Sequence, residues 1–230
     1  MSDQRIAKWT RWIDESPIGP NIHAMFHRRD IWNGVQEIVK DNPDLPPSAF
    51  WEFQFEIYAE AQAMAVRRQA DTHPDVASLA KLLGELKDDA ERITFDWWFG
   101  LWGDDADAHI LGLARQQWAN HYGEGESLDA AIPATDLERI TAASSSVRTY
   151  VNENVAHSEA RGPIPPEVAA REAEDIPTLD DIHAAIDVAG DLYKKYYGLF
   201  TASTLVDVTP IVQHDWRAPF RMPWIVGQAT

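Results

Sequence analysis

Hydrophobic residues recur every three or four positions along most of the chain, a period typical of amphipathic α-helices. Each predicted helix buries one face and exposes the other. Proline- and glycine-rich segments separate the helices, since neither residue continues a helix well. The pattern predicts helices over about residues 4–15, 25–39, 48–71, 76–86, 105–118, 136–157 and 178–199.

Polar residues mark the predicted helix starts, because an N-cap oxygen accepts a hydrogen bond from a free backbone N–H of the first turn. The clearest start is Thr178, which Asp181 follows at the spacing of a capping box. The other expected N-caps are Ser48, Asp75 and either Thr135 or Asp136.

Strand signals are nearly absent, and no glycine-rich phosphate-binding loop follows a strand-like segment. We therefore predict an all-α fold, an up-down bundle of about six to eight helices. The expected division is an N-terminal helix and linker over residues 1–24, the bundle over 25–204 and an irregular aromatic tail over 205–230. We expect the tail to pack as an extended strap or a short strand pair.

Charge and composition narrow the classes of partner. The 230 residues carry a formal net charge of −17 and include ten tryptophans but no cysteine. The negative charge repels phosphate, which argues against a DNA partner and against broad nucleic-acid binding. A local pocket that binds a few nucleotides is compatible with this charge. Without cysteine, the chain has no disulfides, thiolate nucleophiles or Cys-based zinc sites.

The apolar runs and the N-terminal residues bear on the cellular location of the protein. No run approaches 18 uncharged apolar residues, so we expect no membrane partner and no membrane span. Residues 1–5 lack the basic region and the apolar block of a secretory signal. A cytoplasmic location is therefore expected.

The candidate chemistry lies in residues 147–157, where a predicted helix ends in Asn-x-x-x-Ala-His. A neutral His beside polar amides and an Arg is suited to acid–base chemistry on RNA. On a straight helix Tyr150 shares the face of His157, whereas Arg148 lies nearly opposite. Pairing Arg148 with His157 therefore needs a bend or a second chain. The alternative is an ordinary helix end, where the imidazole donates to a nearby carbonyl.

This segment resembles the HEPN superfamily (higher eukaryotes and prokaryotes nucleotide-binding), specifically its AbiU2-like group linked to abortive infection. Asn152, Ala156 and His157 match three positions of the family's helix-end motif. A weaker match is the Arg-x-x-Asp and Ser-Leu-x-x-Leu-Leu pattern in residues 66–71 and 78–83. The resemblance implies a HEPN-like bundle of helices.

The resemblance covers about residues 25–200 and implies a metal-independent endoribonuclease of a toxin or phage-defence module. It implies a homodimer, an RNA substrate, an antitoxin partner and no cofactor. It also implies roles for three residues. His157 is then the acid–base group, Arg148 the phosphate contact, and Asn152 the residue that orients the substrate or His157.

Val151 stands where the family motif has Arg, and this departure bears on catalysis. A cation is needed, because an unneutralised phosphorane is costly. The remaining sources of that cation are Arg148, Arg67, Arg68 and Arg161. If none of them serves, the chain is a catalytically inactive HEPN-like module for binding or oligomerisation, which is the alternative function.

Arg67, Arg68 and Tyr150 are the candidate substrate-binding residues. The two arginines also have a simpler interpretation. Asp71 lies four residues after Arg67 and three after Arg68, so either ion pair fits a helix end. Such pairs are common on protein surfaces, which favours the structural interpretation.

No metal site is predicted. His23 and His27 have the four-residue spacing of helical zinc ligands, but the glutamate of a metalloprotease motif is missing between them. Arg28 and Arg29 adjoin the pair and disfavour a bound cation.

The tryptophans allow two interpretations. Large aromatic side chains most often pack in a core, and we expect this of most of the ten. The alternative is a small-molecule-binding bundle in which Trp97, Trp98 and Trp102 line a pocket.

Overall fold

The computed structural model describes residues 3–44, 48–103, 108–152, 176–209 and 215–221. These residues form helices and contain no β-strand, apart from one isolated bridge between Thr94 and Ser127. The α-helices are α1 (Gln4–Asp14), α2 (Ile18–Asp41), α3 (Ala49–Gln69), α4 (Leu79–Asp88), α5 (Phe95–Gly100), α6 (Ala108–Tyr122), α7 (Ala131–Ala143), α8 (Ser145–Tyr150) and α10 (Leu179–Thr201). Two 3₁₀ turns, η1 (Ala90–Arg92) and η3 (Ala218–Arg221), complete the list. The predicted all-α bundle is confirmed.

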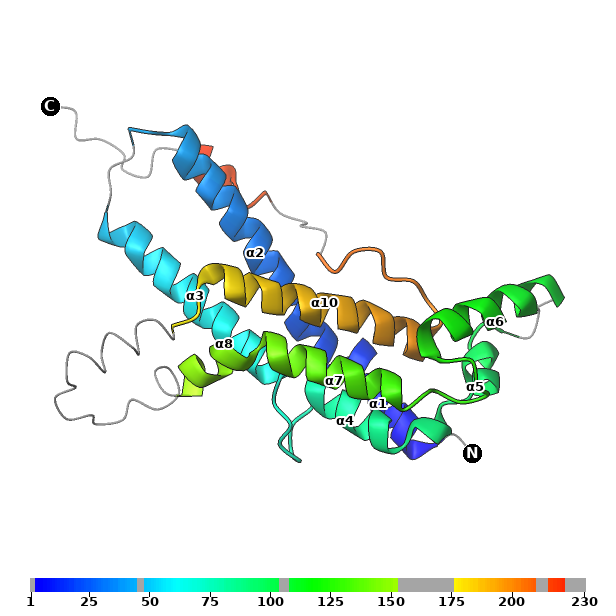
Figure 1. Cartoon of the computed structure of the whole chain (residues 1–230). Helices are drawn as coiled ribbons and strands as arrows, with labels where there is room; N and C mark the ends of the chain where they lie inside the picture. Colours follow the sequence, from blue (N-terminus) through cyan, green and yellow to red (C-terminus); the bar gives the residue numbers. More distant parts are fainter. Residues whose placement is uncertain (1–2, 45–47, 104–107, 153–175, 210–214, 222–230) are drawn as a thin grey trace, which may run out of the picture.

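Helix α10 lies at the centre of the bundle, with α1, α2, α3 and α7 packed around it (Figure 1). Its buried stripe includes Ile186, Tyr193 and Tyr196, at the helical spacing that the sequence predicts. Helix α4 packs against α7 and completes this layer. None of the described helices combines the length and the apolar character that a membrane crossing requires.

The predicted capping box at the start of α10 is confirmed. Thr178 Oγ1 accepts a hydrogen bond from the backbone N–H of Asp181 at 3.2 Å. The Asp181 carboxylate accepts in return from the Thr178 N–H at 2.8 Å. Ser48 precedes α3 as predicted, although its side chain makes no capping hydrogen bond.

The predicted cap of α4 is wrong. Ser78, not Asp75, is the N-cap, and its Oγ accepts from the backbone N–H of Lys81 at 3.0 Å. Both polar residues precede the same hydrophobic stretch, so the sequence pattern alone does not choose between them.

The predicted cap of α7 is also wrong. The helix begins at Ala131, which places Thr135 and Asp136 inside it. Asp136 is only 7% exposed and accepts hydrogen bonds from Lys195 Nζ at 2.6 Å and from Tyr196 OH at 2.9 Å. A polar residue that resembles a cap in the sequence is therefore a buried ion-pair partner of α10.

The helix predicted to run through to residue 157 is interrupted at Ser144, between α7 and α8. The Ser144 hydroxyl is buried and donates to the Ile140 carbonyl at 2.7 Å, a contact that often bends helices. Residues 151–152 then form a π-helical turn, which holds more residues than an α-helical turn.

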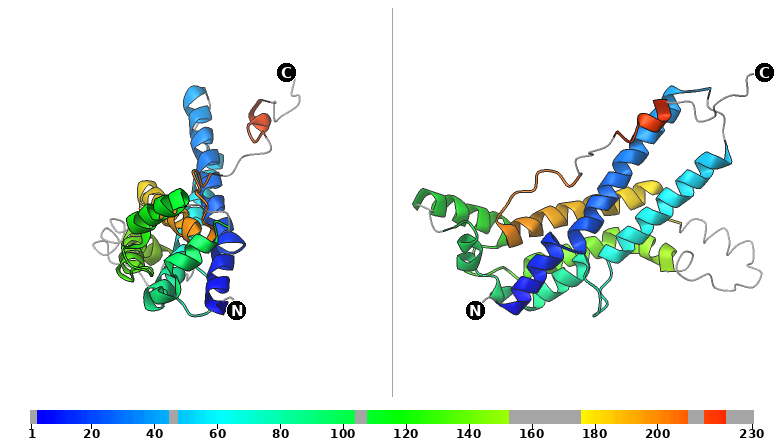
Figure 2. Two further views of the ribbon diagram at one scale, coloured as in Figure 1. Left: turned by 90° about the vertical axis from the view of Figure 1, so that its right-hand side faces the viewer. Right: turned by 180° about the vertical axis from the view of Figure 1, so that it is seen from behind.

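Helix α2 begins at Ile18, well before the predicted start at Met25. Pro20 fits in its first turn, where no intrahelical N–H bond is needed. The outer halves of α2 and α3, residues 28–41 and 48–61, project beyond the other helices (Figure 2). We call this projecting pair of half-helices the arm.

The broad apolar face predicted for α3 is buried only in its inner half. Ala65 is 2% exposed, whereas Phe50, Phe53 and Ile57 in the arm are 44%, 54% and 48% exposed. The hydrophobic pattern therefore continues past the end of the core.

The described part of the tail forms a strap along α2 rather than a strand pair. The Trp216 ring packs so closely on Gly34 that a Cβ there would lie 2.6 Å from the indole. Arg217 Nη2 lies 3.5 Å from Glu37 Oε2, which adds an ion pair to this contact.

Trp98 packs in the core, as expected for most of the tryptophans. It is fully buried, and the rings of Phe95, Trp118 and Tyr122 lie with centroids 5.7–6.1 Å away. Its indole N–H donates to the Gly198 carbonyl at 3.2 Å. This packing leaves no space for a small molecule at Trp98, whereas Trp102 is 38% exposed, so the packing excludes the alternative pocket at Trp98 alone.

Candidate functional site

The end of α3 meets the end of α8, and this contact joins two of the predicted site residues. Arg67 Nε donates to Asn152 Oδ1 at 2.8 Å, although the two residues are 85 positions apart. Because Nε is only a donor, the carbonyl oxygen of the amide faces it. The Asn152 side chain is exposed, and its NH₂ group is left to donate elsewhere.

The predicted ion pair between Arg67 and Asp71 is also present, with Nη1 3.5 Å from Oδ2. The carboxylate offsets part of the charge on Arg67, so this guanidinium is better suited to holding Asn152 than to binding phosphate. Arg68 is exposed, and its side chain forms no hydrogen bond or ion pair within the described ranges.

Arg148 and Tyr150 lie on α8. Arg148 is half-buried, and its side chain makes no hydrogen bond or ion pair with any residue that the structure describes. It precedes Asn152 by four residues, and the π-helical turn at residues 151–152 follows the end of α8 between them. Tyr150 is half-buried against the core. Arg148 thus offers a free guanidinium on α8, four residues before Asn152.

His157 and Arg161 lie outside the described residues, so their predicted roles stay predictions. The π-helical turn at 151–152 changes one argument about them. The placement of Arg148 opposite His157 assumed a straight α-helix, and that projection does not hold beyond the turn.

Val151, at the family's Arg position, is fully buried in the hydrophobic core. An apolar side chain there packs against the bundle and supplies no charge. Any cation that acts with His157 must therefore come from another position, and the described contacts leave the side chains of both Arg148 and Arg68 free.

A second polar cluster lies at the base of the arm, and sequence analysis missed it. Tyr58 OH lies 2.7 Å from His183 Nε2, which connects α3 to α10. Arg29 Nη1 donates to Asp187 Oδ1 at 2.7 Å and to the His183 carbonyl at 3.5 Å. The only sign of this cluster in the sequence is the pair Asp180 and Asp181 shortly before His183. No local pattern indicates Tyr58, because it lies 125 positions away in the chain.

The protonation of this cluster follows from its surroundings. Burial, and next the charge of Arg29, lower the pKa of His183 below its ordinary 6.5. Burial raises the pKa of Tyr58, so the phenol keeps its proton. Tyr58 and His183 therefore share their hydrogen bond as neutral groups, and this bond holds α3 against α10.

His23, one of the two histidines considered for metal binding, has protein partners at both ring nitrogens, whereas His27 Nδ1 is buried without one among the described residues. His23 Nδ1 lies 2.7 Å from the Val208 carbonyl, and its Nε2 lies 3.5 Å from Tyr193 OH. Both ring nitrogens therefore face protein partners. In the parts of the chain that the structure describes, no group of three His, Asp or Glu side chains is arranged to hold a metal ion.

The helical fold is that of an all-α, HEPN-like bundle. A family model described as AbiU2, of the HEPN group, matches residues 23–218. The chain therefore belongs to the HEPN/AbiU2 family, and the resemblance inferred from residues 152–157 is confirmed at the level of the family. Comparisons with curated proteins and with solved structures find no match.

Proposed function

We propose that this protein is a metal-independent endoribonuclease of a toxin or phage-defence module, acting in the cytoplasm as a homodimer. The observation that supports it best is the arrangement of Arg67, Asn152 and Arg148. Arg67 holds the carbonyl of Asn152 and leaves its NH₂ group free to donate. The unpaired guanidinium of Arg148 lies four residues earlier in the chain, and we infer that the amide and the guanidinium contact the same phosphate.

The proposed reaction uses the ribose 2′-hydroxyl as the nucleophile. His157 takes the hydroxyl proton as the oxygen attacks the adjacent phosphorus, and the 5′-oxygen leaves with a proton from an acid. The products are a 2′,3′-cyclic phosphate and a 5′-hydroxyl end. Arg148 stabilises the negative charge that grows on the phosphoryl oxygens.

Arg67 is a positioning residue in this scheme. Its ion pair with Asp71 and its hydrogen bond to Asn152 fix the amide relative to Arg148. In the proposed homodimer, the second copy supplies groups that a single chain does not bring together.

The test is RNA cleavage by the full chain in EDTA. We expect the wild type to cleave total RNA and leave cyclic-phosphate ends. His157→Ala and Arg148→Ala should each lower the rate by about 10²-fold or more, because each removes an acid–base group or a phosphate contact. His121→Ala and Arg139→Ala, exposed residues of the same types elsewhere, are the matched controls.

Two results would contradict the proposal. One is a wild type that cleaves no RNA, and the other is a His157→Ala variant that cleaves as fast as the wild type. Thermal melting of each variant separates loss of activity from loss of the fold.

The second candidate function is a catalytically inactive HEPN-like module for binding or oligomerisation, with an antitoxin as one partner. The buried Val151 favours it, because the family's cation position holds an apolar side chain. Absence of cleavage together with a dimeric mass in solution would support this function over the nuclease.

A further inference from the structure

The arm exposes hydrophobic side chains that a helical bundle ordinarily buries. Phe55 is 45% exposed, and Phe50, Phe53 and Ile57 are exposed to a similar extent. A cluster of large apolar side chains on a surface is typical of a binding site. The neighbouring segments show which of these side chains are covered.

The tail covers one side of the arm. Trp216 packs on Gly34, and Phe220 lines a groove together with Val35 and Ile57. This groove is therefore partly filled by the chain's own C-terminal strap.

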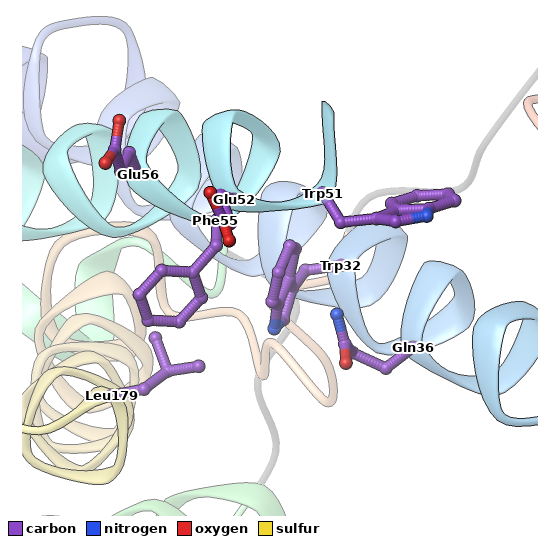
Figure 3. Close-up of a pocket in the computed structure, with 7 residues that line it drawn as sticks. All are labelled: Trp32, Gln36, Trp51, Glu52, Phe55, Glu56 and Leu179. Carbon is purple, nitrogen blue, oxygen red and sulfur yellow. The ribbon is translucent and has the colours of Figure 1, made fainter. Parts of the chain in front are cut away.

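The opposite side holds an open hollow of about 680 Å³ between α2, α3 and the start of α10 (Figure 3). Phe55 points toward Leu179 at the start of α10, and the Trp32 ring lies beside it with centroids 5.9 Å apart. The remaining lining residues are Gln36, Trp51, Glu52 and Glu56.

The aromatic wall of this hollow is fixed in place. Trp32 stacks on Tyr58 with ring centroids 4.6 Å apart and planes 7° from parallel. Tyr58 is in turn held by its hydrogen bond to His183. A wall that is already ordered loses little conformational entropy when a partner binds.

The negative charge of the arm indicates which kind of partner can occupy the hollow. Glu52, Glu56 and Glu60 recur every four residues along the exposed side of α3, and none forms an ion pair within the described ranges. Residues 28–61 contain seven acidic and three basic side chains, a formal net charge of −4. A second copy of this arm would be repelled, whereas a basic surface would be attracted.

We propose that this hollow is a docking site for a basic amphipathic helix of a partner protein. Apolar side chains of that helix pack on Phe55 and Leu179. A Lys or Arg one turn away lies over the Trp32 indole and pairs with Glu52 or Glu56, which combines cation–π and ionic attraction. Helices bind grooves through anchors at this spacing. The docking site does not depend on the nuclease proposal.

The test uses a synthetic helical peptide with leucine on one face and arginine on the other, titrated into the full chain and followed by fluorescence anisotropy. A peptide with glutamate in place of arginine is the peptide control. We expect the arginine peptide to bind, and the Glu52→Lys/Glu56→Lys double variant to weaken binding by about tenfold or more. Phe55→Ser should weaken it as well.

Glu91→Lys/Glu138→Lys is the matched control, because it makes the same change in net charge at exposed sites away from the arm. It should leave the affinity nearly unchanged. Equal weakening by both double variants would show attraction to the acidic protein as a whole and would overturn the proposal. So would absence of peptide binding, or self-association of the wild type that Glu52→Lys/Glu56→Lys changes.

Discussion

Gly19 lies where the first turn of α2 passes the end of α1, and the contact leaves no space for a side chain. A Cβ there would lie 2.7 Å from the Ile13 carbonyl oxygen and 2.6 Å from Tyr193 OH. The carbonyl belongs to a helix end and Tyr193 is buried, so neither neighbour moves freely. Glycine is required here by packing rather than by backbone conformation.

Gly19→Ala should lower the free energy of unfolding by about 1–3 kcal/mol, because overpacking forces its neighbours apart. Gly112→Ala on α6 is the control, since its Cβ would meet nothing within 4 Å. Removing that exposed glycine should raise stability by up to about 1 kcal/mol. Urea denaturation measures both, and changes of the same sign would contradict the packing argument.

His183 makes stability depend on pH. Its pKa in the folded protein lies below the ordinary 6.5, so the unfolded chain binds this proton first as the pH falls. The contribution of neutral His183 to the free energy of unfolding is therefore complete above about pH 6.5. It is lost as the pH falls through the lowered pKa of His183 in the folded protein.

Replacing His183 with Gln should reduce the fall in the urea midpoint between pH 7.5 and pH 5.5. His121→Gln, at an exposed helix end, is the control and should keep the wild-type difference between the two pH values. If His183→Gln and the wild type lose the same stability over this range, His183 does not cause the dependence.

Helix α10 shows what the sequence predicts well about an element. Its capping box, its acidic first turn and its apolar stripe are all local, and each is where the pattern places it. The start of α7 shows the limit. Whether Asp136 caps a helix or pairs with Lys195 depends on a residue 59 positions away, which no local pattern contains.

Thr178→Ala should destabilise the protein by about 1 kcal/mol, because it removes the side-chain half of the capping box. Thr135→Ala, by contrast, replaces an exposed threonine inside α7 and should be neutral or slightly stabilising. Thermal melting compares the two variants. An equal loss of stability would mean that Thr135 also caps a helix.

The fold of the whole molecule was predictable because helical periodicity alone defines an all-α bundle. The candidate site was predictable only in part. The sequence named Arg67 and Asn152 separately, but their hydrogen bond depends on how α3 and α8 pack. The open hollow was not predicted, because the apolar pattern of α3 is the same where the helix is buried and where it projects.

Helix α3 runs without interruption from the arm to Arg67. Its 21 residues span about 30 Å at 1.5 Å per residue, and such a helix behaves as a stiff rod. The arm and the Arg67–Asn152 hydrogen bond therefore belong to one stiff element, so a partner that tilts α3 as a whole should also displace the Asn152 amide.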